Sequence, residues 1–180
     1  MKNWKLESSE EVFSAGSRFS VHKQCVELPA GQKIDDYYFI KGFNFAIIYA
    51  VTQDGFVILE KAYRHGPGKI VWSLPAGHLS PNEIPLDTAK RELLEECGYS
   101  GGTWTEIGSF VNNGNQQAGF AHMFLAEGVT KTTEPESGDL EEMEICLLKP
   151  EELHKMLFDG QIPIISSAAL IALASLKLQQ

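Results

Sequence analysis

Apolar and polar residues alternate along the first third of the chain in a way that predicts antiparallel strands. The turn at residues 29–32 separates two such strands, and the turn Gln53-Asp54-Gly55 separates two others that are more strongly apolar. We expect the first pair to form an N-terminal antiparallel sheet and the second pair to lie in the core. The four predicted strands cover residues 19–28, 37–39, 43–51 and 56–61.

Apolar residues that recur every three or four positions predict helices in the rest of the chain. Leu86, Ala89, Leu93 and Cys97 recur at helical spacing, and Gly98 follows where a helix end favours positive φ. The first helix should therefore run from about residue 86 to 97. Three strands and two helices should follow it, at residues 104–110, 121–126 and 143–148 and at residues 151–158 and 166–178. This order predicts a mixed α+β fold.

Composition narrows the class of protein. A chain of 180 residues with 43% hydrophobic content can bury one substantial core. Its net charge of −9 argues against nonspecific binding to nucleic acid or to anionic membranes, because phosphate polyanions are repelled overall. Residues 1–7 lack the apolar core of a signal peptide, and Cys25, Cys97 and Cys146 include no C-x-x-C pair. We expect a cytoplasmic protein with reduced thiols.

Three carboxylates on one side of the predicted helix are the strongest chemical feature. Glu92 is three residues from Glu95 and four from Glu96, so the three side chains should repel one another. A hard divalent cation would remove the repulsion, because such ions prefer carboxylate oxygens. The pattern therefore predicts a metal site. The alternative is a solvated, charged helix face, which is the usual meaning of an isolated Arg-Glu-x-x-Glu-Glu.

Neighbouring residues complete the predicted site. Arg91 precedes Glu95 by four positions and is close enough to Glu83 for an ion pair that would pin the preceding loop across the helix. Residues 72–77 read as a strand that runs into this loop, which would leave the carbonyl of Ala76 facing the same cavity. That oxygen is a further candidate metal ligand.

Residues 77–99 combine these features in one spacing, G-x5-E-x7-R-E-U-x-E-E-x-G-U, where U is a bulky apolar residue. Seven specified positions would match by chance once in ~10^8 starts. The stretch resembles the signature box of the Nudix hydrolases, with Tyr99 at a position that is usually aliphatic. The resemblance implies a mixed sheet sandwiched by helices (α/β/α), with residues 1–40 as an N-terminal sheet region that dimerises and residues 41–180 as the Nudix hydrolase domain.

Segments outside the box resemble the ADP-ribose pyrophosphatase branch of the family. They are residues 28–31, 54–55, 63–66, 74–77 and 124–126, and Gly160 with the closing helix. The resemblance implies a homodimer that uses Mg²⁺, or Mn²⁺ in its place, to hydrolyse a nucleoside diphosphate linked to another moiety. ADP-ribose or a related nucleotide sugar would yield a nucleoside monophosphate and a sugar phosphate.

The resemblance also assigns roles to residues. It implies that Glu92, Glu95, Glu96 and the Ala76 carbonyl hold the metal. Glu95 and Arg91 are also candidate catalytic residues, and Arg91 would act mainly as a scaffold. Arg64 would lie near the substrate; its alternative is a surface residue at a strand end. The general base would come from the loop before the last strand, where Glu141 is the first choice and Glu142 the second.

One departure from the branch leaves the substrate open. Residues 111–116 contain no proline, whereas ADP-ribose-specific members usually carry one in this region. An ADP-sugar, a GDP-sugar or another dinucleotide would suit the same chemistry. Two other functions stay as alternatives: a house-cleaning hydrolase of nucleoside triphosphates, and a regulator that binds a nucleotide sugar without cleaving it. The N-terminal sheet argues against the first, and the intact carboxylates argue against the second.

Overall fold

The computed structural model describes residues 1–136 and 142–180. These residues form two compact units, one of Met1–Asn44 with Phe110–Phe120 and the other of Phe45–Ser109 with Ala121–Gln180. Two long strands, β9 (Thr103–Asn113) and β10 (Gln117–Lys131), contribute residues to both units. Among the helices of the described residues, none is long and apolar enough to cross a membrane.

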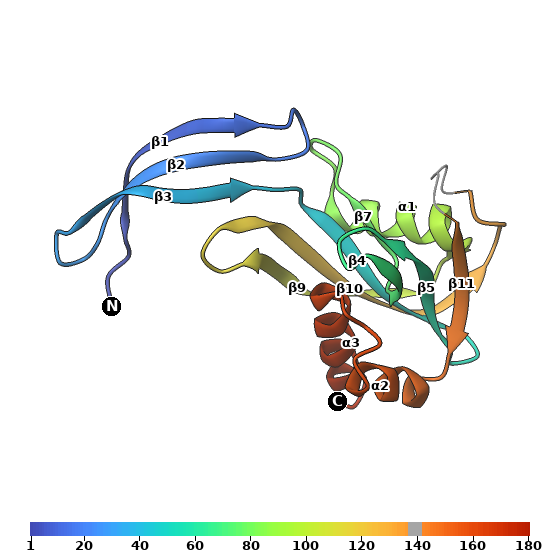
Figure 1. The fold of residues 1–180 in the computed structure, drawn as a ribbon. Coiled ribbons are helices and arrows are strands. Elements are labelled where there is room, and N and C mark those ends of the chain that lie inside the picture. Colours follow the sequence, from blue (N-terminus) through green and yellow to red (C-terminus); the bar gives the residue numbers. More distant parts are fainter. Residues whose placement is uncertain (137–141) are drawn as a thin grey trace. The chain divides into compact units, whose positions relative to one another are not determined.

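The first unit is built on an antiparallel sheet, as the alternation predicts. Its strands are β1 (Lys5–Ser14), β2 (Ser20–Glu27) and β3 (Lys33–Lys41), and β2 pairs with both of the others (Figure 1). Strand β1 has no counterpart among the strands predicted from the sequence. All ten of its residues are exposed, so no buried face imposes an alternation of apolar and polar residues on this strand.

The second unit has a mixed sheet with helices on both faces. Within it, β4 (Phe45–Thr52) runs parallel to β10, while β5 (Val57–Arg64) runs antiparallel to β6 (Lys69–Ser73) and to β11 (Met143–Leu148). Two short strands, β7 (Ala76–His78) and β8 (Tyr99–Ser100), pair with β4 and β10. The mixed sheet of the predicted α+β fold is therefore confirmed.

Alternation along β4 decides which helices cover each face. Ala46 and Ile48 pack in a buried cluster with Leu93 of α1 (Pro85–Cys97). Ile47 and Tyr49 pack in a second cluster with residues of α2 (Pro150–Phe158) and α3 (Ile165–Lys177). Figure 1 shows α1 on one side of β4 and β5 and the α2–α3 pair on the other. This is the expected α/β/α sandwich, and its core strands are those that the apolar pattern predicts.

Residues at both ends of helix α1 favour its start and its end. Pro85 occupies its first turn, where a missing N–H is harmless, and Asp87 lies near the positive end of the helix dipole. Gly98 ends it with φ 77°, a left-handed conformation that other residues rarely adopt. Because β7 pairs with β4, Ala76 and Gly77 are held on the sheet just before the loop that leads into α1.

Candidate active site

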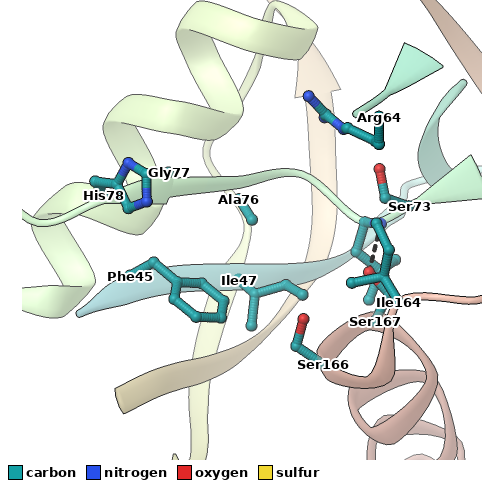
Figure 2. A pocket seen from close by; sticks show the side chains of 11 residues that line it. Phe45, Ile47, Arg64, Ser73, Ala76, Gly77, His78, Ile164, Ser166 and Ser167 are labelled. Atoms are coloured by element: carbon teal, nitrogen blue, oxygen red, sulfur yellow. Dashed lines mark hydrogen bonds between the residues drawn. The ribbon is translucent and has the colours of Figure 1, made fainter. Parts of the chain in front are cut away.

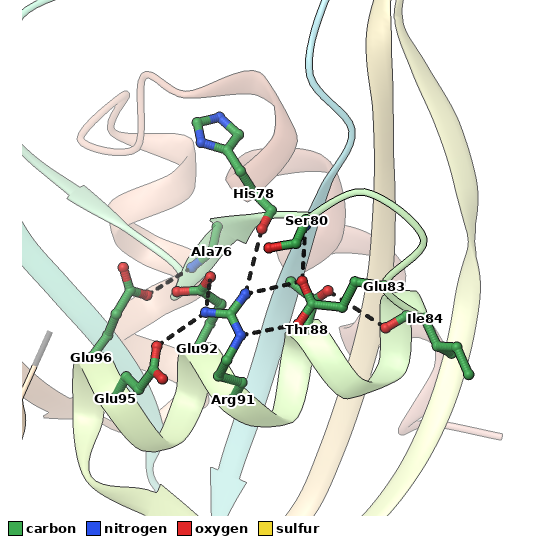
Figure 3. A network of polar contacts seen from close by, with 10 residues as sticks. All are labelled: Ala76, His78, Ser80, Glu83, Ile84, Thr88, Arg91, Glu92, Glu95 and Glu96. Atoms are coloured by element: carbon green, nitrogen blue, oxygen red, sulfur yellow. Dashed lines mark hydrogen bonds and ion pairs between the residues drawn. The ribbon is translucent and has the colours of Figure 1, made fainter. Parts of the chain in front are cut away.

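Arg91 joins the loop before α1 to the carboxylates on the helix (Figure 3). Its Nε lies 3.0 Å from Oε1 of Glu83, and its Nη1 lies 2.8 Å from Oε1 of Glu92 and 3.0 Å from Oε2 of Glu95. Glu83 also accepts a hydrogen bond from the Ser80 N–H at 2.9 Å. These bonds, above all those from Arg91, lower the pKa of Glu83 to about 2. The ion pair predicted between Arg91 and Glu83 is therefore present.

Glu92 lies directly against the backbone of Gly77. A Cβ placed on Gly77 would be 1.8 Å from the carboxyl carbon of Glu92, so any larger residue would displace the carboxylate. This close approach explains why the motif has glycine at this position. The Glu92 side chain is 12% exposed, and burial raises its pKa although the neighbouring Arg91 opposes the shift.

Glu96 lies deeper in the same region. Its Oε2 accepts a hydrogen bond of 3.2 Å from the N–H of Ala76, and the residue is only 7% exposed. Burial, together with the nearby carboxyl group of Glu60, raises the pKa of Glu96 to about 10. Two of the three predicted carboxylates therefore lie against neighbouring residues of β7, Glu92 against Gly77 and Glu96 against Ala76.

Glu60 was missed by sequence reasoning. It lies on β5 and is completely buried, with its Oε2 3.1 Å from Nη2 of Arg64 and its Oε1 3.8 Å from the Cys97 thiol, which donates to it. Burial raises the pKa of Glu60, and its carboxyl group lies against that of Glu96. The signal that could have found it is a carboxylate within an apolar strand. Glu60 follows Ile58 by two residues, and the two side chains therefore lie on the same face of the sheet.

Arg64 borders a cavity of about 270 Å³ that also reaches Ala76 and Gly77 (Figure 2). Its side chain is 32% exposed. It lies within β5, whereas the sequence placed the end of that strand near Lys61. The remaining lining is mostly apolar, with hydroxyl groups from Ser73 and α3; the Ser73 hydroxyl is buried and has no hydrogen-bond partner among the described residues. The predicted substrate residue and the predicted ligand Ala76 therefore share one cavity.

Of the two candidate general bases, the structure describes only Glu142. Glu141 lies outside the described residues. Glu142 is exposed and lines a different cavity, of about 640 Å³, with Lys61 and Tyr63 of β5.

The carboxylates suit a hard divalent cation in their chemistry. All the candidate donors are oxygens. The half-buried Glu92 and the buried Glu96 have an energetic reason to accept a cation, because burial disfavours their anionic forms. The three carboxylates are not gathered around one point, because Glu92 and Glu95 meet at Nη1 of Arg91 whereas Glu96 turns to the N–H of Ala76. In residues 1–136 and 142–180, no three His, Cys, Asp or Glu side chains form a ready metal-binding group. The residues fit the ion by type and burial.

Comparison with known proteins decides the family. The NUDIX domain model matches residues 42–167, which include the whole segment from β7 through α1. The chain belongs to the Nudix family. The resemblance shown by the signature box is thereby confirmed, and this Nudix hydrolase carries the family's box on the β7–α1 segment described above.

Two relatives match the Nudix hydrolase along most of its length. An ADP-ribose pyrophosphatase of Bacillus subtilis (strain 168) is 30% identical over 171 residues, which cover 94% of this chain and 91% of the relative. A methanol dehydrogenase activator of Bacillus methanolicus is 27% identical over 173 residues, with 96% and 91% covered. A crystal structure of an ADP compounds hydrolase shares the fold, with a TM-score of 0.85 at 17% identity over 99% of this chain and 96% of that one.

Proposed function

We propose that this Nudix hydrolase cleaves the pyrophosphate bond of ADP-ribose or a related nucleotide sugar, releasing a nucleoside monophosphate and a sugar phosphate. The observation that carries the proposal is the placement of Glu92 and Glu96 against Gly77 and Ala76, at the cavity that Arg64 borders. The B. subtilis relative, an ADP-ribose pyrophosphatase, supports this class of substrate. The absence of proline from residues 111–116 keeps ADP-sugars and GDP-sugars in the class.

The proposed cofactor is Mg²⁺, with Mn²⁺ accepted by the same ligands. Glu92, Glu95, Glu96 and the carbonyl of Ala76 would hold the ion, because Mg²⁺ favours a few carboxylates together with water and phosphate oxygens. When bound, such an ion polarises a phosphoryl oxygen and lowers the pKa of a water molecule. Arg91 keeps Glu92 and Glu95 on the same side of α1 and ties that side of the helix to the Glu83 loop.

Other residues of the chain act on the substrate directly. The guanidinium of Arg64 neutralises part of the diphosphate charge, which otherwise repels an incoming nucleophile. A carboxylate of the loop before β11 accepts the proton of the attacking water, with Glu141 as the first choice and Glu142 as the second. The hydroxyl groups of Ser73, Ser166 and Ser167 line the same cavity and could donate hydrogen bonds to phosphate oxygens beside Arg64.

The metal assignment is tested by removing one anion without changing the shape of the side chain. Glu96→Gln should lower the Mg²⁺-dependent release of nucleoside monophosphate from ADP-ribose, ADP-sugars and GDP-sugars by about 100-fold or more, because it loses a buried ligand. Glu127→Gln, which changes an exposed carboxylate on β10, should retain full activity. Undiminished turnover by Glu96→Gln would refute the assignment. Thermal stabilisation of the wild type by ADP-ribose without any product would instead favour the non-catalytic regulator.

The choice of general base needs a separate pair of variants. Glu141→Gln should lower kcat by roughly 10²–10⁴-fold with little change in KM, since a general base acts in the transition state. It should also remove the acid limb of the profile of kcat against pH. Glu142→Gln should leave both nearly unchanged. The reverse result would transfer the role to Glu142, and unchanged kcat in both variants would exclude this loop as the source of the base.

The proposal has two further parts, a homodimer, which the first unit supports, and a cytoplasmic location, which the cysteines of both units support. Several large apolar side chains are exposed on β1, just before it and in the β1–β2 turn: Trp4, Leu6, Val12, Phe13 and Phe19. Contact with a second copy of the chain would remove them from water. The three cysteines are free, which suits a reducing compartment.

A further inference from the structure

Glu60 occupies a position where the second unit is otherwise apolar. It follows Ile58 by two residues on β5, so both side chains point to the face that packs against α1. Ile58 belongs there to the buried cluster that includes Ala89 and Leu93. The Glu60 side chain is only 1% exposed. A carboxyl group buried on an apolar face loses its hydration, which costs free energy unless polar partners compensate for the loss. Packing alone therefore does not account for the carboxyl group.

The contacts of Glu60 connect two parts of the site that act on different groups. One carboxyl oxygen is 3.1 Å from Nη2 of Arg64, the residue assigned to the substrate. The carboxyl group also lies against Glu96, which is assigned to the metal and whose Oε2 is bonded to the Ala76 N–H. The Cys97 thiol, 3.8 Å from the other oxygen, anchors the group to the last turn of α1. One buried side chain thus bridges the substrate arginine and a metal carboxylate.

We propose that Glu60 is a positioning residue that holds Glu96 toward the metal and Arg64 toward the cavity at Ala76 and Gly77. The inference rests on the proposed function, because it assumes a divalent cation at Glu96 and a diphosphate at Arg64. Partners that orient metal ligands matter greatly for affinity, and their removal typically weakens metal binding by about 10–100-fold. The loss of Glu60 should also remove one ion-pair partner that orients the guanidinium of Arg64, which weakens substrate binding.

The first test measures Mn²⁺ binding in the absence of nucleotide. Glu60→Gln keeps the shape of the side chain, and Glu60→Val suits both the strand and the apolar face. By electron paramagnetic resonance titration, both variants should bind Mn²⁺ about 10–100-fold more weakly than the wild type. Both variants should still unfold cooperatively on heating without metal, so that the loss of Mn²⁺ affinity is measured on folded protein. Glu127→Gln is the matched control, because it removes an exposed carboxylate from the same unit and should leave Mn²⁺ affinity unchanged.

The second test separates binding from turnover. At saturating Mg²⁺, Glu60→Gln should raise KM for ADP-ribose by a larger factor than it lowers kcat, because Arg64 loses one of the groups that orient it. Unchanged Mn²⁺ affinity in folded Glu60→Gln and Glu60→Val would overturn the inference and leave Glu60 a purely structural role. A wild type that binds Mn²⁺ but hydrolyses no nucleotide sugar would refute the proposed function alone, since the metal titration uses no nucleotide.

Discussion

At the scale of single residues, the site is defined by carboxylates that lie in different surroundings. Glu83 is stabilised as an anion by Arg91, whereas burial disfavours the anions of Glu92 and Glu96. The sequence predicts that Glu92, Glu95 and Glu96 share one side of a helix, because residues three and four apart are neighbours there. It does not predict that Glu96 lies against Glu60, because that contact depends on how β5 packs on α1.

The raised pKa of Glu96 makes stability depend on pH. The pKa in the folded protein is about 10, against an ordinary value of 4.5, so this group favours folding most below pH 4.5 and loses that contribution as pH rises toward 10. Without metal, the melting temperature should therefore fall between pH 5 and pH 8. The slope should reach up to about 1.4 kcal/mol per pH unit, and each kcal/mol corresponds to roughly 2–4 °C.

Differential scanning calorimetry in the presence of a chelator measures this slope. Glu96→Gln lacks the titrating group and should show a flatter dependence over the same range. Wild-type Mg²⁺-loaded protein should also show a flatter dependence, since a cation favours the ionised form of its ligand. Parallel slopes for the metal-free wild type and Glu96→Gln would contradict the attribution to Glu96.

At the scale of elements, local signals determine α1 far better than they determine the strands. The helix predicted from about residue 86 to 97 is observed at Pro85–Cys97, because Pro85 and Gly98 act through their own backbone geometry. Strand β1 was missed because none of its residues is buried. Strand β5 continues to Arg64 because it pairs with β6, in which Lys69 opposes Arg64, and no local signal reports that pairing.

The end of α1 offers a test at this scale. Gly98 has φ 77°, and a Cβ there would lie 2.2 Å from the carbonyl oxygen of Thr133. Gly98→Ala should therefore lower the free energy of unfolding through both backbone strain and a backbone clash, by about 2–4 kcal/mol in total. Gly101→Ala is the matched control, because Gly101 has φ 78° and open space around it. It should lose only about 1–2 kcal/mol.

Urea denaturation of both variants separates the two effects. The difference between Gly98→Ala and Gly101→Ala reports the clash with Thr133. Equal losses would show that the backbone near Thr133 yields without cost and that Gly98 is required only for its left-handed conformation.

At the scale of the whole molecule, the exposed apolar side chains of the first unit predict self-association. Phe13 on β1 is 53% exposed and packs against Phe19, with ring centroids 5.7 Å apart. The wild type should elute at twice the mass of one chain in size-exclusion chromatography with light scattering. Phe13→Glu should shift it to the mass of a single chain, because a charge in an apolar interface is poorly compensated.

Phe158 provides the control for this experiment. It is 90% exposed and belongs to the second unit, so Phe158→Glu makes the same chemical change outside the first unit. This variant should remain a dimer. A wild type that elutes as a single chain, or a dimer that survives Phe13→Glu, would contradict the proposed interface.

The sequence by itself determined the family, the helix that carries the carboxylates and the pairing of Arg91 with Glu83. All three depend on residue types at fixed spacings within one short segment. Helix geometry turns the spacing of the carboxylates directly into neighbours, and the short loop before α1 keeps Glu83 within reach of Arg91. Only the tertiary structure decided that Glu92 lies against Gly77 and that Glu60 lies beside Glu96 and Arg64. Glu60 and Cys97, which is also in this cluster, are 37 positions apart. Their contact arises from the packing of a strand on a helix, which periodicity along the chain does not encode.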